Sequence, residues 1–367
     1  MSEPDSLYLW DAAARAGLSY RNYGEFIGTL SAADVAAVNE RKGKVYPDVS
    51  PTVVAVPTKA PLEDHFNPAF RAFDMWTPDA MTPDSYMSAK ASAGALDPVI
   101  CPEHRDARFR GTSRLGVLLK DFRGFVEDLE AGNGDRMPSL SIMHLPNDHT
   151  SGLTQQHATP QFLVADNDYA LGRVVEAVSH SPYWKSTAIL VVEDDAQDGP
   201  DHVDAHRSPV LVISAYNRPG QLVHAVHNTV SLIRTLELLL GIQPMNIIDA
   251  SAAPMDVFQD RPDLTPYTAQ LPDVAGDNLI FHGPTTAQER HWTKETSRLV
   301  LTVPDAADPR VLNEVIWFSV RGGSRPMPAP ARSALVDAMR SGIDEAGQEA
   351  ARAPLRLAMR ALRQSRP

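Results

Sequence analysis

Residues 187–214, TAILVVEDDAQDGPDHVDAHRSPVLVIS, carry two apolar runs that are separated by an acidic loop. The runs 187–192 and 209–214 are nearly continuous in apolar residues, which is the pattern of strands buried on both faces. Strands of this kind occur in sheets that helices cover on both sides. The stretch therefore predicts an α/β protein in which a polar loop leaves one edge of a buried sheet.

Helical and strand patterns on either side of this stretch extend the prediction. Apolar spacing predicts helices over residues 115–129, 168–180 and 229–240, and alternation predicts a strand over residues 139–145. Asn167 or Asp168 is expected to cap the second helix, and Thr229 the third. Gly241 is expected to end the third helix. The order of these elements predicts a mostly parallel sheet covered by helices.

Proline marks the segments that break this regular pattern. Residues 46–105 hold runs such as PDVSPTVVAVPTKAP and TPDAMTPD, and we expect them to form a long irregular insertion. Residues 115–255 form the regular core with the polar loops, and residues 1–345 are expected to make one domain. A basic helix or tail is expected over residues 346–367, where arginines recur at helical spacing.

Composition narrows the classes of function. The 367 residues are 43 % hydrophobic and 22 % charged, as in folded proteins, and the net charge of −12 argues against a nucleic-acid-binding surface. The only cysteine, Cys101, permits neither an intramolecular disulfide nor a thiolate metal cluster. No apolar run approaches the roughly 20 residues of a transmembrane segment, and the first residues do not resemble a signal peptide. At face value these features indicate a cytoplasmic protein.

Two polar loops follow strands at the edge where parallel strands end. Asp194 and Asp195 come directly after one predicted strand, and His202 and His206 lie a short loop further on. His149 follows the neighbouring predicted strand, so we expect it to reach the same edge. Carboxylate and imidazole groups are ligands for divalent cations. The loops therefore predict a metal site that could polarise a phosphoryl oxygen or activate a nucleophile.

Other interpretations explain these loops less well. An acidic loop after a strand is most often solvated surface, but the nearby histidines weigh against this interpretation. A calcium loop of the EF-hand type fails, because counting from Asp194 the third and twelfth positions are Ala196 and Ala205. The acids of residues 166–168 are better explained by helix capping. The sequence has neither a GxSxG elbow nor a Walker-type glycine loop.

Longer stretches resemble a known family. The sequences PNDHTSG, ADNDYALGRVVEAVSHSPYWKSTAILVVEDDAQDGPDHVDAHRSPVLVIS and HNTVSLIRTLELLLGIQPMNIIDASAAPM are similar to the bacterial phosphoesterase family of the alkaline-phosphatase-like superfamily. That family includes phospholipase C-type enzymes and acid phosphatases. The resemblance spans most of residues 7–260 and is nearest to domains fused behind a β-propeller. It implies a three-layer α/β/α sandwich with a mostly parallel sheet and metal-dependent hydrolysis of phosphate esters.

The resemblance also implies roles for individual residues. Asp194 and Asp195 occupy the place of the acidic pair that binds metal in the family. The family's DHV sequence corresponds to residues 201–203, and its histidine-bearing pocket loop to residues 147–149. His206 lies in a segment typical of the propeller-linked members. The candidate catalytic residues are therefore Asp148, His149, His202 and His206, beside a divalent metal ion.

The family pattern is incomplete at its beginning. Family members open with a strand that ends in Glu-Asn-Arg and supplies metal ligands, and a Ser or Thr nucleophile follows. Neither is found here, because residues 39–41 read Asn-Glu-Arg and follow a helix-like segment. We therefore expect an N-terminally truncated domain whose open sheet edge could be covered by the proline-rich segment 46–105, by a second subunit or by a separately encoded N-terminal piece. Localisation stays open, because a missing N-terminus would remove any export signal.

These observations predict a metal-dependent hydrolase of phosphate esters that is incomplete by itself. The alternative is a metal-binding or interaction module that derives from a phosphoesterase and has lost catalysis. A small-molecule phosphate ester and a phospholipid head group both fit as the substrate. Oxygen ligands favour magnesium, calcium or manganese, whereas histidine ligands would favour zinc or iron.

Overall fold

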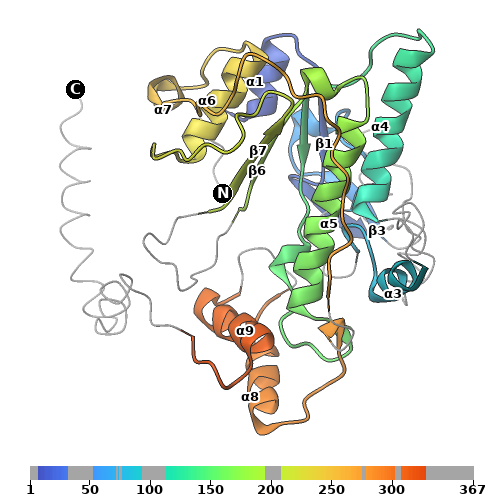
Figure 1. The fold of residues 1–367 in the computed structure, drawn as a ribbon, viewed down its shortest axis with the longest axis vertical. Coiled ribbons are helices and arrows are strands. Elements are labelled where there is room, and N and C mark those ends of the chain that lie inside the picture. Colours follow the sequence, from blue (N-terminus) through green and yellow to red (C-terminus); the bar gives the residue numbers. More distant parts are fainter. Residues whose placement is uncertain are drawn as a thin grey trace, which may run out of the picture.

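The chain contains both helices and strands throughout its described length, which confirms the mixed helix and strand composition (Figure 1). The computed structural model describes residues 7–31, 53–71, 73, 77–92, 113–194, 208–274, 278–301 and 307–327. Its helices are α1 (Leu9–Arg15), α3 (Pro83–Ser92), α4 (Arg114–Glu130), α5 (Pro160–Ser179), α6 (Thr229–Leu240), α7 (Ile247–Ser251), α8 (Ala287–Thr296) and α9 (Pro309–Arg321). Its strands are β1 (Tyr20–Tyr23), β2 (Ile27–Ser31), β3 (Val53–Pro57), β4 (Leu140–Met143), β5 (His157–Ala158), β6 (Ala188–Val192), β7 (Val210–Ser214) and β8 (Ile280–Phe281). None of the described helices is both long and apolar enough to cross a membrane.

The described strands associate in pairs. β1 and β4 run parallel, with Tyr20 opposite Leu140 and Tyr23 opposite Met143. The pairs β2–β3, β5–β8 and β6–β7 are antiparallel. The parallel pair joins two segments that lie far apart in the sequence. The continuous sheet that a three-layer sandwich requires stays a prediction.

Strands β6 and β7 lie where the sequence predicted them but are less buried than predicted. The residues of β6 are half-buried or exposed, and Val192, Val210 and Leu211 are 40, 40 and 48 % exposed. The two strands form an antiparallel ribbon in which Ala188 lies opposite Ser214. A continuous apolar run carries no periodicity, so it cannot separate a doubly buried strand from a half-buried ribbon.

Helix α5 begins earlier than the sequence predicted. Thr159 caps it by accepting a hydrogen bond from a backbone N–H of the first turn, and Pro160 occupies that turn. Asp166 and Asn167 therefore lie inside the helix, and the capping role predicted for Asn167 or Asp168 is wrong. Asp166 is only 1 % exposed, so α5 carries a buried carboxylate.

The proline-rich segment 46–105 is more regular than predicted in its described part. It holds β3, the short 3-10 helix η1 (Ala60–Leu62) and α3. Tyr86 of α3 is fully buried and donates its hydroxyl to the carbonyl oxygens of Pro272 and Val274, at 2.9 and 3.0 Å. This segment is therefore anchored in the core rather than lying over the surface.

Helices α3, α4 and α5 surround the largest apolar cluster, and α4 and α5 pack side by side (Figure 1). All three helices contribute buried members to it, among them Tyr86, Leu115, Phe162, Tyr169 and Ala170. Burying a large apolar side chain contributes about 1.5–3 kcal/mol to the stability of a fold. This cluster fixes α4 and α5 relative to each other, and the polar network described below includes the first residue of α4 and Asp166 inside α5.

Helix α6 is capped at both ends. Asn228 rather than Thr229 is its N-cap, because the Asn228 side chain accepts from the N–H of Ser231 at 3.0 Å. The Ser231 hydroxyl in turn accepts from the N–H of Asn228 at 3.4 Å, which completes a capping box. Gly241 ends the helix as predicted, with a left-handed φ of +68°.

Two glycine substitutions should change stability in opposite directions. Gly241→Ala places a side chain in the left-handed region, so we expect the free energy of unfolding to fall by about 1–2 kcal/mol. Gly124 lies inside α4, with no heavy atom within 4 Å of the position a Cβ would take. Gly124→Ala should therefore raise the free energy of unfolding by about 0.5–1 kcal/mol. Urea denaturation measures both changes in the free energy of unfolding. Two changes in the same direction would contradict this account.

Candidate functional site

Three loops that carry acids meet at one edge of the fold. Glu25 follows β1, Asp148 lies in the 3-10 turn Asn147–His149 after β4, and Glu193 and Asp194 follow β6. Because β1 and β4 are parallel, their carboxyl ends lie side by side. Charge interactions join Glu25 to Asp194 and Asp148 to Glu193, which brings the end of β6 to the same place.

Burial and mutual repulsion raise the pKa of two of these acids. Burial raises the pKa of Asp148 to about 6, and the charges of Asp79 and Glu193 contribute to the rise. Burial also raises the pKa of Glu25, and the charge of Asp194 contributes. An acid with a pKa close to neutral pH is suited to proton transfer. The surplus of negative charge at this edge also suits a bound cation.

Backbone strain accompanies both of the turns that carry these acids. Phe26, next to Glu25, has a φ of +50°, and Thr150, next to His149, has a φ of +65°. A backbone conformation at positive φ costs a residue with a side chain about 1–3 kcal/mol, and Thr150 is β-branched as well. Such strain persists only where the surrounding structure fixes it, and it is concentrated at functional sites.

His149 lies half-buried beside an aromatic ring. Its ring centroid is 5.0 Å from that of Phe73, and the two planes meet at 78°. Its Nδ1 lies 3.3 Å from the carbonyl oxygen of Thr150. A carbonyl oxygen can only accept, so in the neutral ring Nδ1 carries the hydrogen and Nε2 is the acceptor. His149 can therefore present a proton-accepting nitrogen.

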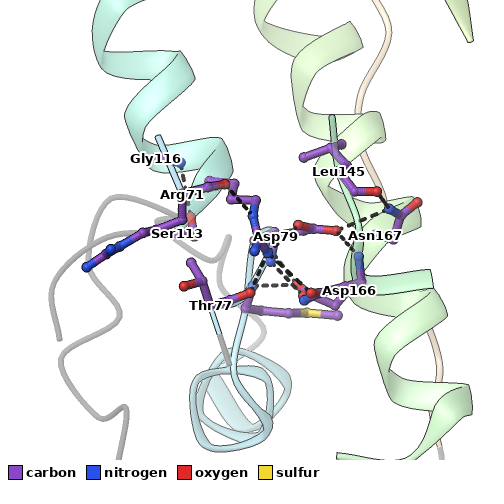
Figure 2. Close-up of polar contacts among 12 residues, drawn as sticks. Arg71, Thr77, Asp79, Ser113, Gly116, Leu145, Asp166 and Asn167 are labelled. Carbon is purple, nitrogen blue, oxygen red and sulfur yellow. Dashed lines mark hydrogen bonds and ion pairs between the residues drawn. The ribbon is translucent and has the colours of Figure 1, made fainter. Parts of the chain in front are cut away.

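A fully buried ion pair lies close to these turns. Nη1 of Arg114, the first residue of α4, is 3.0 Å from Oδ1 of Asp79, and both side chains are 0 % exposed. Arg114 also donates to the carbonyl oxygens of Arg71 and Thr77, at 2.9 and 2.6 Å. Burial raises the pKa of Asp79, and the Arg114 charge opposes this rise. Figure 2 shows Asp79 between α4 and α5, so the pair joins the two helices to the segment before α3.

A second buried carboxylate, Asp166 of α5, extends this network. Its oxygens accept from the backbone N–H groups of Asp79, Ala80 and Met81 at 2.7–2.8 Å, and from Nδ2 of Asn147 at 2.6 Å. Burial, followed by the charge of Asp79, raises the pKa of Asp166 to about 7, against the effect of these donors. Asp166 is therefore joined to the Asp79–Arg114 pair through backbone N–H groups and Asn147, in a site without water contact.

Asp79, Arg114 and Asp166 were not predicted from the sequence as site residues. Asp79 lies in the proline-rich segment interpreted as an irregular insertion, and Asp166 was interpreted as part of a helix cap. One signal was available for Asp166. Phe162, Asp166 and Ala170 are spaced four residues apart, which places them on one face of a helix, and the apolar members mark that face as buried.

The structure describes part of the predicted metal site. Asp194 is described and exposed at the end of β6, whereas Asp195, His202 and His206 lie outside the described residues. Across the described parts of the chain, no three Asp, Glu, His or Cys side chains are grouped so that they could hold a metal ion. The metal site stays a prediction, and among its described residues Asp194 lies near Glu25.

In α/β folds, ligands bind at the carboxyl ends of the strands, where these acidic side chains gather. Residues 101–243 match the model of the Phosphoesterase family. This segment contains α4, β4, α5, β6 and β7, with the 147–149 turn and Asp194, so the resemblance is confirmed there. No curated protein and no solved structure matches the chain.

Removal of Asp79 should strongly destabilise the fold. Asp79→Ala leaves the Arg114 guanidinium buried without its carboxylate, so we expect the free energy of unfolding to fall by about 3–5 kcal/mol. Asp273, which is 93 % exposed and pairs with Lys90, provides the control, and Asp273→Ala should leave stability unchanged. Urea denaturation measures both, and equal effects would show that burial of the pair is unimportant.

The raised pKa of Asp166 should make stability depend on pH. The folded protein keeps this proton up to about pH 7, whereas the unfolded chain releases it near pH 4. The free energy of unfolding should therefore fall as the pH rises from about 4 to 7, by at most about 1.4 kcal/mol per pH unit. Asp148 and Glu25 act in the same direction. Denaturation at both ends of this range should show a smaller fall in Asp166→Asn, and an unchanged fall would contradict the role of Asp166.

Proposed function

We propose that this chain hydrolyses phosphate esters, with a divalent metal ion, at the edge where the loops after β1, β4 and β6 meet. The observation that carries the proposal is that Asp148 meets the acidic end of β6 within a segment that matches the Phosphoesterase family. Phosphoryl transfer depends on positioning and on stabilising negative charge, which strand-end carboxylates achieve through a bound cation.

Asp194 and Asp195 are the proposed metal ligands. The carboxylates of Asp194 and Glu25 repel each other as like charges. A hard cation bound between them would neutralise this repulsion, so the described donors fit such an ion. Carboxylate oxygens favour magnesium, calcium or manganese, whereas ligation by His202 or His206 would favour zinc or iron. When bound, such an ion polarises the phosphoryl group and stabilises the charge that develops on it.

Asp148 and His149 are the proposed proton-transfer groups. With a pKa of about 6, Asp148 carries a proton in part of the molecules near neutral pH and can give it to the leaving-group oxygen. His149 presents Nε2 as an acceptor and can take a proton from the attacking hydroxyl group or water. His202 and His206, from the loop after β6, complete the proposed catalytic set.

The family resemblance supports a finer architecture. We propose a three-layer α/β/α sandwich in one domain, in which a second copy or a partner chain covers the open edge of the sheet. Among the described strands, β4 pairs only with β1, and β6 pairs only with β7. A small phosphate ester and a phospholipid head group share the chemistry that this edge would recognise.

Loss of Asp194 should remove hydrolysis without unfolding the protein. With p-nitrophenyl phosphate and Mg²⁺, Mn²⁺ or Zn²⁺, we expect Asp194→Ala to lower the rate by about 10²–10⁴-fold, since the residues of a site act as a unit. Asp194 is exposed, so its removal leaves no buried charge unpaired. Asp256→Ala is the matched control, because Asp256 is 87 % exposed and pairs with Arg218, which lies beyond the opposite end of the β6–β7 ribbon.

Three outcomes of this experiment are informative. Equal rates for Asp194→Ala and the unchanged protein would overturn the site. Metal binding at one ion per chain in calorimetry, with no turnover of the monoester or of a phospholipid, would identify the catalytically inactive metal-binding module instead. Turnover of the phospholipid alone would select the head group as substrate.

A further inference from the structure

We propose that Asn147 is a positioning residue, which holds the 147–149 turn at the end of β4 by connecting it to three buried ionisable side chains. The inference rests on the proposed function only in that Asp148 and His149 of this turn are the proposed proton-transfer groups. Asn147 would not touch the substrate. It would act by fixing the backbone from which the two reacting side chains extend.

Three contacts fix both the backbone and the side chain of Asn147. Its N–H donates to Oδ2 of Asp79 at 3.1 Å, its Oδ1 accepts from Nη1 of Arg114 at 3.2 Å, and its Nδ2 donates to Oδ2 of Asp166 at 2.6 Å. Asn147 is 3 % exposed, and its three partners are at most 1 % exposed. Hydrogen bonds to charged partners that water cannot reach are the strong ones. Asn147 therefore cannot move without breaking contacts to three segments.

The residues on either side of Asn147 are held by the same network. The N–H of Thr150 donates to the carbonyl oxygen of Asn147 at 3.1 Å, which closes the turn. On the other side, Nδ2 of Asn167 donates to the carbonyl oxygen of Leu145 at 2.8 Å and to Oδ2 of Asp79 at 3.1 Å. The left-handed φ of Thr150 is consistent with this account, because a strained residue persists only where its neighbours are fixed.

The chemistry of the position selects asparagine. The side chain must accept from Arg114 and donate to Asp166 at once, and only an amide offers an acceptor and a donor in that arrangement. Aspartate would place a further negative charge against Asp166. Alanine would leave Asp166 with three donors instead of four, and would remove one of the acceptors of Arg114. The contact is therefore specific rather than a matter of filling space.

The matched control for Asn147 is Asn67, a second buried asparagine whose side-chain partners lie outside the 147–149 turn. Asn67 is 8 % exposed, its Nδ2 donates to Oδ2 of Asp121 at 2.9 Å, and its Oδ1 accepts from the N–H of Ala69 at 2.8 Å. Both asparagines thus bridge a carboxylate and a further donor. Comparing Asn147→Ala with Asn67→Ala separates the position of the turn from the general cost of losing a buried amide.

The first measurement is hydrogen exchange of the full chain, resolved to the peptide that contains residues 147–150. We expect Asn147→Ala to speed exchange of the Thr150 N–H at least about 10-fold under conditions where both variants stay folded by circular dichroism, because its acceptor is carried by the loosened residue. Asn67→Ala should leave this peptide unchanged. Equal protection of the turn in both variants would overturn the proposal, whatever the chain catalyses.

The second measurement is hydrolysis of p-nitrophenyl phosphate with Mn²⁺. A positioning role predicts that Asn147→Ala lowers kcat by about 10–100-fold while KM changes less than about 3-fold, because misplaced reacting groups affect the transition state more than binding. Asn67→Ala should keep the kcat of the unchanged protein. A parallel loss of kcat in both variants would point to general destabilisation and contradict the proposal.

A milder variant covers the case in which Asn147→Ala does not fold. Asn167 is half-buried, and Asn167→Ala removes the contacts of Leu145 and Asp79 but leaves Asn147 in place. Exchange of the 147–150 peptide should rise in this variant too, by a smaller factor, and unchanged exchange would overturn the proposal. If the unchanged protein shows no turnover, the proposed function fails, while the exchange data still decide whether Asn147 positions the turn.

Discussion

The ion pair between Asp79 and Arg114 is the contact on which the arrangement of the site depends. Both groups are fully buried, so each would cost several kcal/mol in an apolar interior if it lacked its partners. The pair is therefore satisfied from several directions, by the carbonyl oxygens around Arg114 and by the donors around Asp79. These partners belong to the segment before α3, to α4, to the end of β4 and to α5 (Figure 2). The need to satisfy two buried charges thus fixes where four segments meet.

The buried network contains more acidic groups than basic groups, and this imbalance affects the pKa values of its carboxyl groups. Asp166 adds a second carboxyl group beside Asp79, and its pKa rises to about 7. A purely apolar contact between α4 and α5 would be simpler and often more stable, because buried ion pairs seldom repay the loss of hydration. Buried polar networks do specify one arrangement, since every alternative leaves donors or acceptors unpaired. The network therefore favours a single position of the 147–149 turn over maximal stability.

The sequence predicts the parts of this structure that depend on local pattern. Helix α4, strand β4 and the end of α6 at Gly241 follow from spacing and from the conformational freedom of glycine. The meeting of the acidic loops after β4 and β6 follows from their place at strand ends. The contacts of Asp79 do not follow, because its partners in α4, the turn and α5 lie 35, 68 and 88 residues away in the sequence. No periodicity within a segment records such contacts. The capping interpretation of Asp166 was wrong for the same reason, since a buried polar residue inside a helix is explained only by its distant partners.

Asp148 lies between the buried network and the exposed edge. Both can therefore affect the pKa of this one side chain, which is a proposed proton-transfer group. Burial is the main cause of its raised pKa, but the charges that add to it come from Asp79 on the inner side and Glu193 on the outer side. A change of charge on either side therefore changes the pKa of Asp148. A cation at the edge would lower the pKa of Asp148, whereas negative charge on Asp79 raises it. The backbone strain at Thr150 and the fall in stability expected towards neutral pH both accompany a partly buried acid that lies beside other acids. Functional sites commonly keep such locally unfavourable features.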